Sequence, residues 1–272
     1  GKLFLDESDD RTHLQGSLSV PHVHTTGTDE DISILRRSFS NGLCHGVGMW
    51  FMDQSACTWY DDPQIHQAFA QMKKLADLSL KLNRSDCSET AVISSMESGY
   101  YHLDRITGQD TITYRLNRHQ ISELHKSGVP FSRYLIEDLA AGLVPEHKIY
   151  IFLDCFYLSE DQRQAVEKLK TRGNTLVWFY APGFVKENGL SLETMQELTG
   201  FEFQMESRGD VDSELRLVPS LFGEQSVVFG ASVPQAPCFY VQAKPDEIWA
   251  RFTDHGFAGM AVRDFEQWRS VY

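Results

Sequence analysis

Cysteine is scarce in this sequence and is not arranged for disulfides or for metal binding. The 272 residues contain five cysteines, and no two of them have the spacing of a C-x-x-C motif. This absence argues against a zinc ribbon and a thioredoxin-like redox site. A disulfide framework is not expected either, because so few cysteines are spread over so long a chain. We expect most of these thiols to be buried: Cys44, Cys57, Cys87, Cys155 and Cys238.

Positive charge and long apolar runs are also lacking. The chain has 25 Lys and Arg residues against 38 Asp and Glu residues, which gives a formal net charge of −13. Nucleic acids and anionic membrane surfaces bind clustered positive charge, so neither is an expected partner. No apolar stretch approaches the ~20 residues of a membrane-spanning helix, and the first ten residues, GKLFLDESDD, are too acidic for a signal peptide. We expect a soluble protein with no targeting segment in this sequence, and the compartment stays open.

Phosphate-binding loops and metal-ligand clusters are missing as well. The nearest glycine-rich sequence, NGLCHGVG at residues 41–48, precedes a predicted strand, whereas a dinucleotide-binding loop follows a strand and opens a helix. His22 and His24 form an H-x-H pair that would face one side of a strand, but no third ligand stands at a useful spacing. We therefore expect neither a nucleotide cofactor nor a metal.

Residues 1–84 alternate between strands and helices. A short strand over Lys2–Asp6 is followed by a helix that begins at Thr28, where Thr28 and Asp31 have capping-box spacing. A mostly apolar strand over Val47–Asp53 comes next, and Asp62-Pro63 then opens a second helix with the carboxylate as its cap. The order strand, helix, strand, helix predicts parallel pairing, with the helices packed on a face of the sheet.

Residues 88–272 continue this alternation and then change. Four predicted strands alternate with helices, which is typical of a doubly wound parallel sheet. Helices are predicted to begin at Asn117, at Ser159 with Gln162 as a capping box, and at Ser191, whose helix ends at Gly200. From residue 201 onward short strands follow one another without helices, so we expect a small antiparallel patch there. The four alternating strands are Thr90–Ser95, Phe131–Glu137, Lys148–Asp154 and Thr175–Ala181.

Three segments of the chain resemble one enzyme family. The segment GMWFMDQSACTWYDDP, residues 48–63, is similar to the last barrel strand and following loop of glycoside hydrolases related to the family 42 β-galactosidases. The segment DESDDRTHL, residues 6–14, resembles the end of their seventh barrel strand. Residues 134–183 resemble their α/β domain, which is similar to class I glutamine amidotransferases and mediates trimer formation in that family.

This resemblance implies how the chain is organised. Residues 1–84 would be the last two βα units of a TIM barrel, and residues 88–272 would be an amidotransferase-like α/β domain. The chain would then be a C-terminal fragment of a retaining β-glycosidase. It would carry the oligomerisation domain and form a homo-oligomer, a trimer or a dimer.

The resemblance also implies a catalytic residue. Retaining glycosidases use two carboxyl groups ~5–5.5 Å apart, one as nucleophile and one as acid/base. Glu7 matches the place of the nucleophile at the end of barrel strand seven, and Arg11 would orient or neutralise a carboxylate there. Asp6 is a weaker candidate for the same role. The acid/base lies on barrel strand four, outside this sequence, so we expect no activity from the chain alone. The alternative is that Glu7 belongs to a solvated acidic loop.

A sugar subsite is expected after the second strand. Trp50, Trp59, Tyr60 and Asp53 lie at or just beyond its end, where aromatic faces stack on sugar rings and a carboxylate binds hydroxyl groups. The substrate of the parent enzyme would be a carbohydrate. The alternative is that Trp50 and Phe51 pack within the barrel and the helix layer.

The α/β domain has no convincing nucleophile of its own. Cys155 follows an apolar strand, as the amidotransferase nucleophile does, but its surroundings, LDCFY, contain no glycine for the tight turn that such a residue needs. We expect a non-catalytic relative of that fold, since fold alone does not confer activity. This leaves a second interpretation of the whole chain, a stand-alone interaction or oligomerisation module.

Overall fold

The computed structural model describes two compact units. They comprise Gly1–Asp86 and Cys87–Tyr272, and each is treated by itself. The described residues are 4–15, 25–53, 58–101, 112–207, 212–218, 227–230 and 235–272. Within them, no helix combines the length and the apolar character that crossing a bilayer requires.

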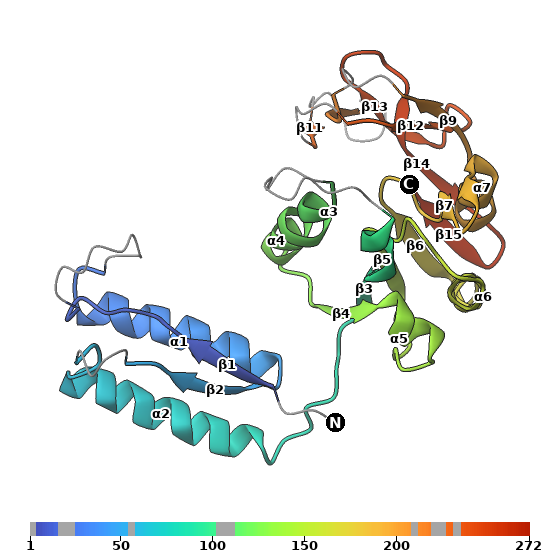
Figure 1. Cartoon of the computed structure of the whole chain (residues 1–272). Coiled ribbons are helices and arrows are strands. Elements are labelled where there is room, and N and C mark those ends of the chain that lie inside the picture. Colours follow the sequence, from blue (N-terminus) through green and yellow to red (C-terminus); the bar gives the residue numbers. More distant parts are fainter. Residues whose placement is uncertain are drawn as a thin grey trace. The chain divides into compact units, whose positions relative to one another are not determined.

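The first unit consists of two strands and two helices in alternation (Figure 1). The strands pair in parallel, with Leu5 opposite Gly48 and Ser8 opposite Phe51. The pairing is parallel because the helix between the two strands returns the chain to the end of the sheet at which the first strand began. The elements are β1 (Leu5–Ser8), α1 (Thr28–Cys44), β2 (Gly48–Phe51) and α2 (Pro63–Ser79).

A small aromatic core holds this unit together. Helices α1 and α2 pack on each other, and Phe51 of β2 contacts Phe69 of α2 with ring centroids 4.7 Å apart. The buried residues come from both helices and from the segment before α2, where Trp59 is only 1% exposed. They are Leu35, Trp59, Tyr60, Ile65, Ala68 and Met72.

One of the two predicted helix caps is confirmed and the other is wrong. Asp62 caps α2, because its carboxylate accepts hydrogen bonds from the backbone N–H groups of Gln64 (2.7 Å) and Ile65 (3.2 Å). At α1 the N-cap is Gly27, with no side-chain cap hydrogen bond. The predicted capping box of Thr28 and Asp31 does not form, because the Asp31 carboxylate is bound to His13 instead.

The second unit is built on one large sheet that is rich in parallel strands. Nine described strands form it, in the order β11-β10-β13-β14-β15-β6-β5-β3-β4. The strands from β4 to β15 are parallel, and those from β14 to β11 are antiparallel. In chain order they are β3 (Thr90–Ser94), β4 (Phe131–Leu135), β5 (Ile149–Phe152), β6 (Asn174–Trp178), β10 (Leu215–Leu217), β11 (Val228–Phe229), β13 (Ile248–Phe252), β14 (Ala258–Asp264) and β15 (Trp268–Val271). A mixed α/β fold with a sheet rich in parallel strands is therefore confirmed.

Helices lie on both sides of the parallel strands (Figure 1). Helix α4 (Gln120–Lys126) continues from α3 (Ile112–Tyr114) through a π-helical turn over Arg115–His119. On the other side α5 (Ile136–Ala140) packs on α6 (Glu160–Glu167), which contacts α7 (Leu192–Thr199). The capping box of Ser159 with Gln162 and the cap at Ser191 both form as predicted.

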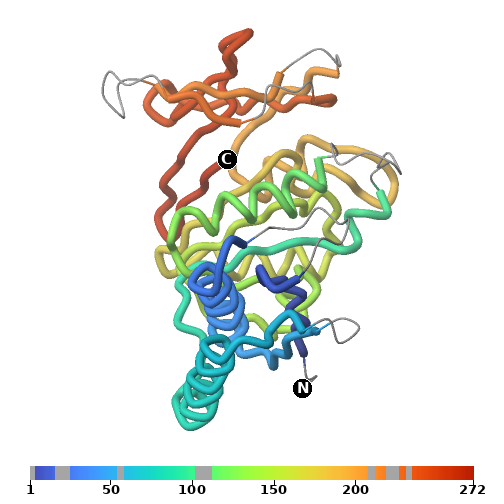
Figure 2. The backbone as a smooth tube through the Cα atoms, turned by 90° about the vertical axis from the view of Figure 1, so that its left-hand side faces the viewer, coloured from blue at the N-terminus to red at the C-terminus, as the bar shows by residue number. Residues whose placement is uncertain are grey.

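One prediction for this unit is wrong in detail. Asn117 does not cap a helix but lies within the π-helical turn, where its side-chain amide bonds the buried Asp154 and its oxygen accepts from Ser94. Antiparallel strands are found after residue 201, and four of them extend the large sheet beyond β15. Figure 2 shows these orange and red strands gathered at one end of the unit.

Two short two-stranded sheets complete the second unit. One pairs β9 (Glu202–Glu206) with β12 (Cys238–Gln242). The other is a tight hairpin of β7 (Val185–Lys186) and β8 (Gly189–Leu190), which follows the carboxyl end of β6.

Candidate functional site

Glu7 and Trp50 share one face of the two-stranded sheet. They are Cα partners in the parallel pairing of β1 with β2. Paired residues on neighbouring strands point to the same side, and the side alternates from one residue to the next. The opposite face carries Ser8 and Phe51, and there Ser8 is buried and Phe51 packs on α2. Glu7 is exposed and Trp50 is 47% exposed, so their shared face is turned away from the aromatic core.

The Glu7 carboxylate has no partner among the described residues, whereas Asp9 and Asp10 are both engaged. The Ser8 hydroxyl donates to a carboxylate oxygen of Asp10 at 2.6 Å. The Asp9 carboxylate lies 4.0 Å from Nε of Arg11. Asp6 is half-buried and alternates to the other face of β1, so Glu7 is the exposed carboxylate of β1 that can receive an incoming group.

Arg11 lies over the ring of Trp59. Its guanidinium carbon is 5.0 Å from the ring centroid, and its side chain is only 10% exposed. This geometry is a cation–π contact, which is stronger where water is excluded. Because Trp59 is 1% exposed, its ring supports Arg11 and offers no face to a sugar. In the described part of the chain, Nε of Arg11 and Nε1 of Trp59 are buried without a hydrogen-bond partner.

Tyr60 joins the ends of the two strands, and Asp53 contacts the segment before α2. Asp53 is exposed, and one of its carboxylate oxygens lies 3.5 Å from the backbone N of Trp59. The Tyr60 hydroxyl lies within hydrogen-bonding distance of the carbonyl oxygens of Asp10 (2.8 Å) and Met52 (3.2 Å). Burial raises the pKa of Tyr60 well above its usual value, and the charges of Asp10, Asp53 and Asp9 raise it further. The phenol therefore stays a neutral donor that ties the loop after β1 to the end of β2.

A second set of contacts fixes the segment after β1, and sequence patterns gave little sign of it. The Thr12 hydroxyl donates to the carbonyl oxygen of Trp59. His13 donates its backbone N–H to Asp31 at 3.0 Å, and its ring Nδ1 pairs with the other oxygen of that carboxylate. Asp31 is 1% exposed. The sequence shows only an acidic first turn of a helix there, and the burial of Asp31 that marks this pair is visible only in the folded chain.

The remaining chemistry anticipated from the sequence is not assembled in the described structure. Cys155 is 1% exposed, and burial, with the charges of Asp154 and Glu137, raises the pKa of its thiol well above the usual value. A nucleophilic cysteine needs the opposite shift. Among the described residues no group of three or more His, Cys, Asp or Glu side chains is placed to hold a metal ion. His22 and His24 lie outside the described residues.

This fold is shared with glycoside hydrolases. No family profile matches the sequence, and no curated protein matches it. Several solved structures match the fold of this chain, and three of them have sequence identities of 14–16%. One is a β-galactosidase from Bacillus circulans sp. alkalophilus. The match to it has a TM-score of 0.68 and 16% identity, and covers 99% of this chain and 42% of that one.

Two further structures agree with the first. A catalytic mutant of a family 42 β-galactosidase from G. stearothermophilus matches with a TM-score of 0.61 over 89% of this chain and 36% of its own, at 14% identity. A β-galactosidase from Halorubrum lacusprofundi matches with a TM-score of 0.61 over 93% and 38%, at 15% identity. The resemblance to family 42 β-galactosidases is thus confirmed as a likeness of fold. The chain spans about two fifths of the length of these structures.

Proposed function

We propose that this chain is the C-terminal part of a retaining β-glycosidase, with a β-galactoside or a related carbohydrate as the substrate of the whole enzyme. Residues 1–84 would supply the last two βα units of a TIM barrel. Residues 88–272 would be a doubly wound, amidotransferase-like domain through which the enzyme forms a trimer or a dimer. The observation that carries the proposal is the face of β1 and β2 on which Glu7 lies opposite Trp50.

The placement of this face suits the interior of a barrel. In a TIM barrel the helices pack outside the parallel strands, and the opposite face of each strand points inward. Here the helix-facing side holds Ser8 and Phe51, and the other side holds Glu7 and Trp50. Catalytic groups of such barrels lie at the carboxyl ends of the strands. Glu7 is the third of the four residues of β1.

The apolar surface of the first unit also favours further strands. Phe4 is 69% exposed and Leu5 is 59% exposed, beside the half-exposed Trp50. Two strands alone leave unpaired edges and are marginal in water. Neighbouring barrel strands would pair with these edges and cover these side chains, which makes a free-standing interaction module the weaker proposal.

Each site residue then has a chemical role. The Glu7 carboxylate would attack the anomeric carbon while the bond to the leaving oxygen breaks. An acid residue from a barrel strand outside these 272 residues would protonate that oxygen. The same residue would deprotonate the water that releases the sugar with retained configuration. Trp50 would stack on the sugar and Asp53 would accept its hydroxyl hydrogen bonds, while Arg11, held on Trp59, would set the charge near the nucleophile.

Trapping of the nucleophile tests this proposal. A 2-deoxy-2-fluoro-β-galactoside with a good leaving group should label the whole enzyme on Glu7, as read by peptide mass mapping. The variant Glu7→Gln should lose at least ~10³-fold in kcat, whereas Asp9→Asn, two residues away, should lose far less. The isolated chain should not hydrolyse an aryl β-galactoside. Labelling of a different carboxylate, or turnover by the isolated chain that survives Glu7→Gln, would contradict the proposal.

A further inference from the structure

A pocket of the second unit lies beyond the carboxyl ends of β5 and β6, far in sequence from the proposed nucleophile. Its volume is about 470 Å³, within the range of ~300–1,000 Å³ that small-molecule sites occupy. Ligands of open α/β sheets bind outside the carboxyl ends of the strands. The lining residues come from the segment that leads into α6, from the first residues of α6 itself, from the β7–β8 hairpin and from the residue that caps α7.

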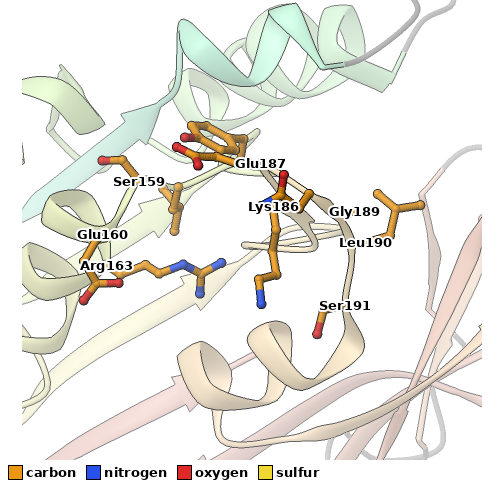
Figure 3. Close-up of a pocket in the computed structure, with 11 residues that line it drawn as sticks. Ser159, Glu160, Arg163, Lys186, Glu187, Gly189, Leu190 and Ser191 are labelled. Atoms are coloured by element: carbon orange, nitrogen blue, oxygen red, sulfur yellow. The ribbon is translucent and has the colours of Figure 1, made fainter.

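Two cationic side chains point into this pocket. Figure 3 shows the ends of Arg163 and Lys186 extending into the same open space. Arg163 donates one hydrogen bond, to the carbonyl oxygen of Gly183 at 2.9 Å. Within the described part of the chain it forms no ion pair. Burial lowers the pKa of Arg163 from its usual value, and the negative charges of Glu197 and Glu160 partly offset this by raising the pKa. The guanidinium is thus partly removed from water with most of its donors unused.

The backbone is shaped to leave room for this guanidinium. Gly183 has a φ of +65°, and a Cβ there would lie 3.0 Å from one guanidinium nitrogen of Arg163 and 2.3 Å from Leu198. The Gly183 carbonyl also accepts from the Thr194 hydroxyl at 2.7 Å. Arg163 therefore lies closely against this turn and is hydrogen-bonded to it. Its substitution would not leave that carbonyl unsatisfied.

Further donors surround the same space. The pocket reaches Ser159 and Ser191, the N-cap residues of α6 and α7, so the positive ends of two helix dipoles lie at its border. Two cations that converge repel each other, and a bound oxyanion would relieve that repulsion. Two lining carboxylates disfavour a ligand with high negative charge. Glu160 is exposed and accepts a hydrogen bond from Gln164 at 3.0 Å, and Glu187 is exposed in the hairpin turn.

We propose that this pocket binds a small hydroxyl-bearing molecule through its one anionic group, a phosphate or a carboxylate, with Arg163 and Lys186 as the charged contacts. The two rim carboxylates would accept hydrogen bonds from the hydroxyl groups and disfavour a second anionic group. The site uses no residue of the proposed glycosidase centre, so the test of this pocket does not depend on that function.

Calorimetric titration of the chain tests the site, with inorganic phosphate as one probe and glucuronate as the other. At least one should bind with a dissociation constant of about 1 mM or below at low salt, and binding should weaken as salt rises. Arg163→Gln and Lys186→Met should each weaken it at least tenfold. Binding of phosphate alone would show that the site prefers a phosphate as the anionic group, and binding of glucuronate alone would show that it prefers a carboxylate.

A matched control separates this site from general charge effects. Arg133→Gln removes an exposed arginine of β4 outside the pocket and should leave the affinity unchanged. Each variant should keep the thermal unfolding midpoint of the parent chain. If Arg163→Gln lowers that midpoint, the test depends on Lys186→Met, because Lys186 is exposed and its loss should not affect folding. Absence of binding by both probes at about 10 mM, or equal affinity of the Lys186 variant and the parent chain, would overturn the proposal.

Discussion

Trp50 lies directly opposite Glu7 in the parallel pairing of β1 with β2, and both side chains are on the face turned away from the aromatic core. Nine residues beyond Trp50, Trp59 has the opposite environment, since it is 1% exposed beneath Arg11. Two tryptophans that the sequence groups together therefore have different roles. Trp50 is available to a ligand, and Trp59 supports the fold and positions Arg11.

This difference between the tryptophans predicts unequal losses of stability. Trp59→Ala should lower the free energy of unfolding by ~3–5 kcal/mol, because it empties a buried site. Trp50→Ala should lower it by less than ~1 kcal/mol, since the side chain is half exposed. Urea denaturation of the isolated chain measures both. Similar losses for the two variants would show that Trp50 is also a packing residue of this unit.

A pH dependence is expected from the pair of Glu247, which directly precedes β13, and Arg263 of β14. Two hydrogen bonds of 2.7 and 2.8 Å join the guanidinium to the carboxylate. The bond from Arg263 lowers the pKa of Glu247 to about 2, although partial burial opposes it. A lowered pKa means that this stabilisation is complete above the ordinary pKa of a glutamate, near 4.5, and is lost as pH falls toward 2.

The variant Glu247→Gln measures that contribution. At pH 7 it should cost ~2 kcal/mol of unfolding free energy, the range of a charge-assisted hydrogen bond. The difference from the parent chain should shrink between pH 5 and about 2. Glu123→Gln breaks an exposed pair with Lys126 and should cost less than ~0.5 kcal/mol at any pH. A Glu247 effect that does not change with pH would rule out this linkage.

Cysteine alkylation should divide the described thiols into two groups. Cys44 and Cys87 are exposed, and Cys155 and Cys238 are buried. Burial, with the charge of Asp254, raises the pKa of Cys238 to about 11, and the pKa of Cys155 is also raised. Iodoacetamide at pH 8 should therefore modify the first two in the native chain and the last two only after unfolding. Peptide mass mapping reads this directly, and rapid native labelling of Cys155 would contradict its burial.

Local signals in the sequence predicted local structure well. The capping box of Ser159 with Gln162, the cap at Asp62 and the apolar run of β3 each depend on a few neighbouring residues, and each is found. The errors arise where a distant residue competes. Asp31 binds His13 and does not form the predicted capping box. Asn117 binds the buried Asp154 and does not cap a helix. A single sequence contains no record of such tertiary partners.

The same limit applies to the candidate sites. Glu7, Trp50 and Asp53 could be proposed because a resemblance placed them at strand ends. The support given to Arg11 by Trp59 depends on a segment 48 positions away in the sequence, and only the folded chain brings them together. The Arg163 pocket gave no sequence signal, because its lining comes from helix α6 and from short neighbouring segments with ordinary composition.

The distance between two carboxyl groups tests the central claim most directly. It should be measured in an experimental structure of the whole enzyme that contains this sequence. If β1 and β2 are adjacent strands of a closed barrel, the Glu7 carboxyl group should lie ~5–5.5 Å from a second carboxyl group contributed by another strand. A Glu7 side chain that points out of the barrel, or a nearest inward carboxyl group ~6.5–9.5 Å away, would contradict the assignment of Glu7 as the nucleophile of a retaining glycosidase.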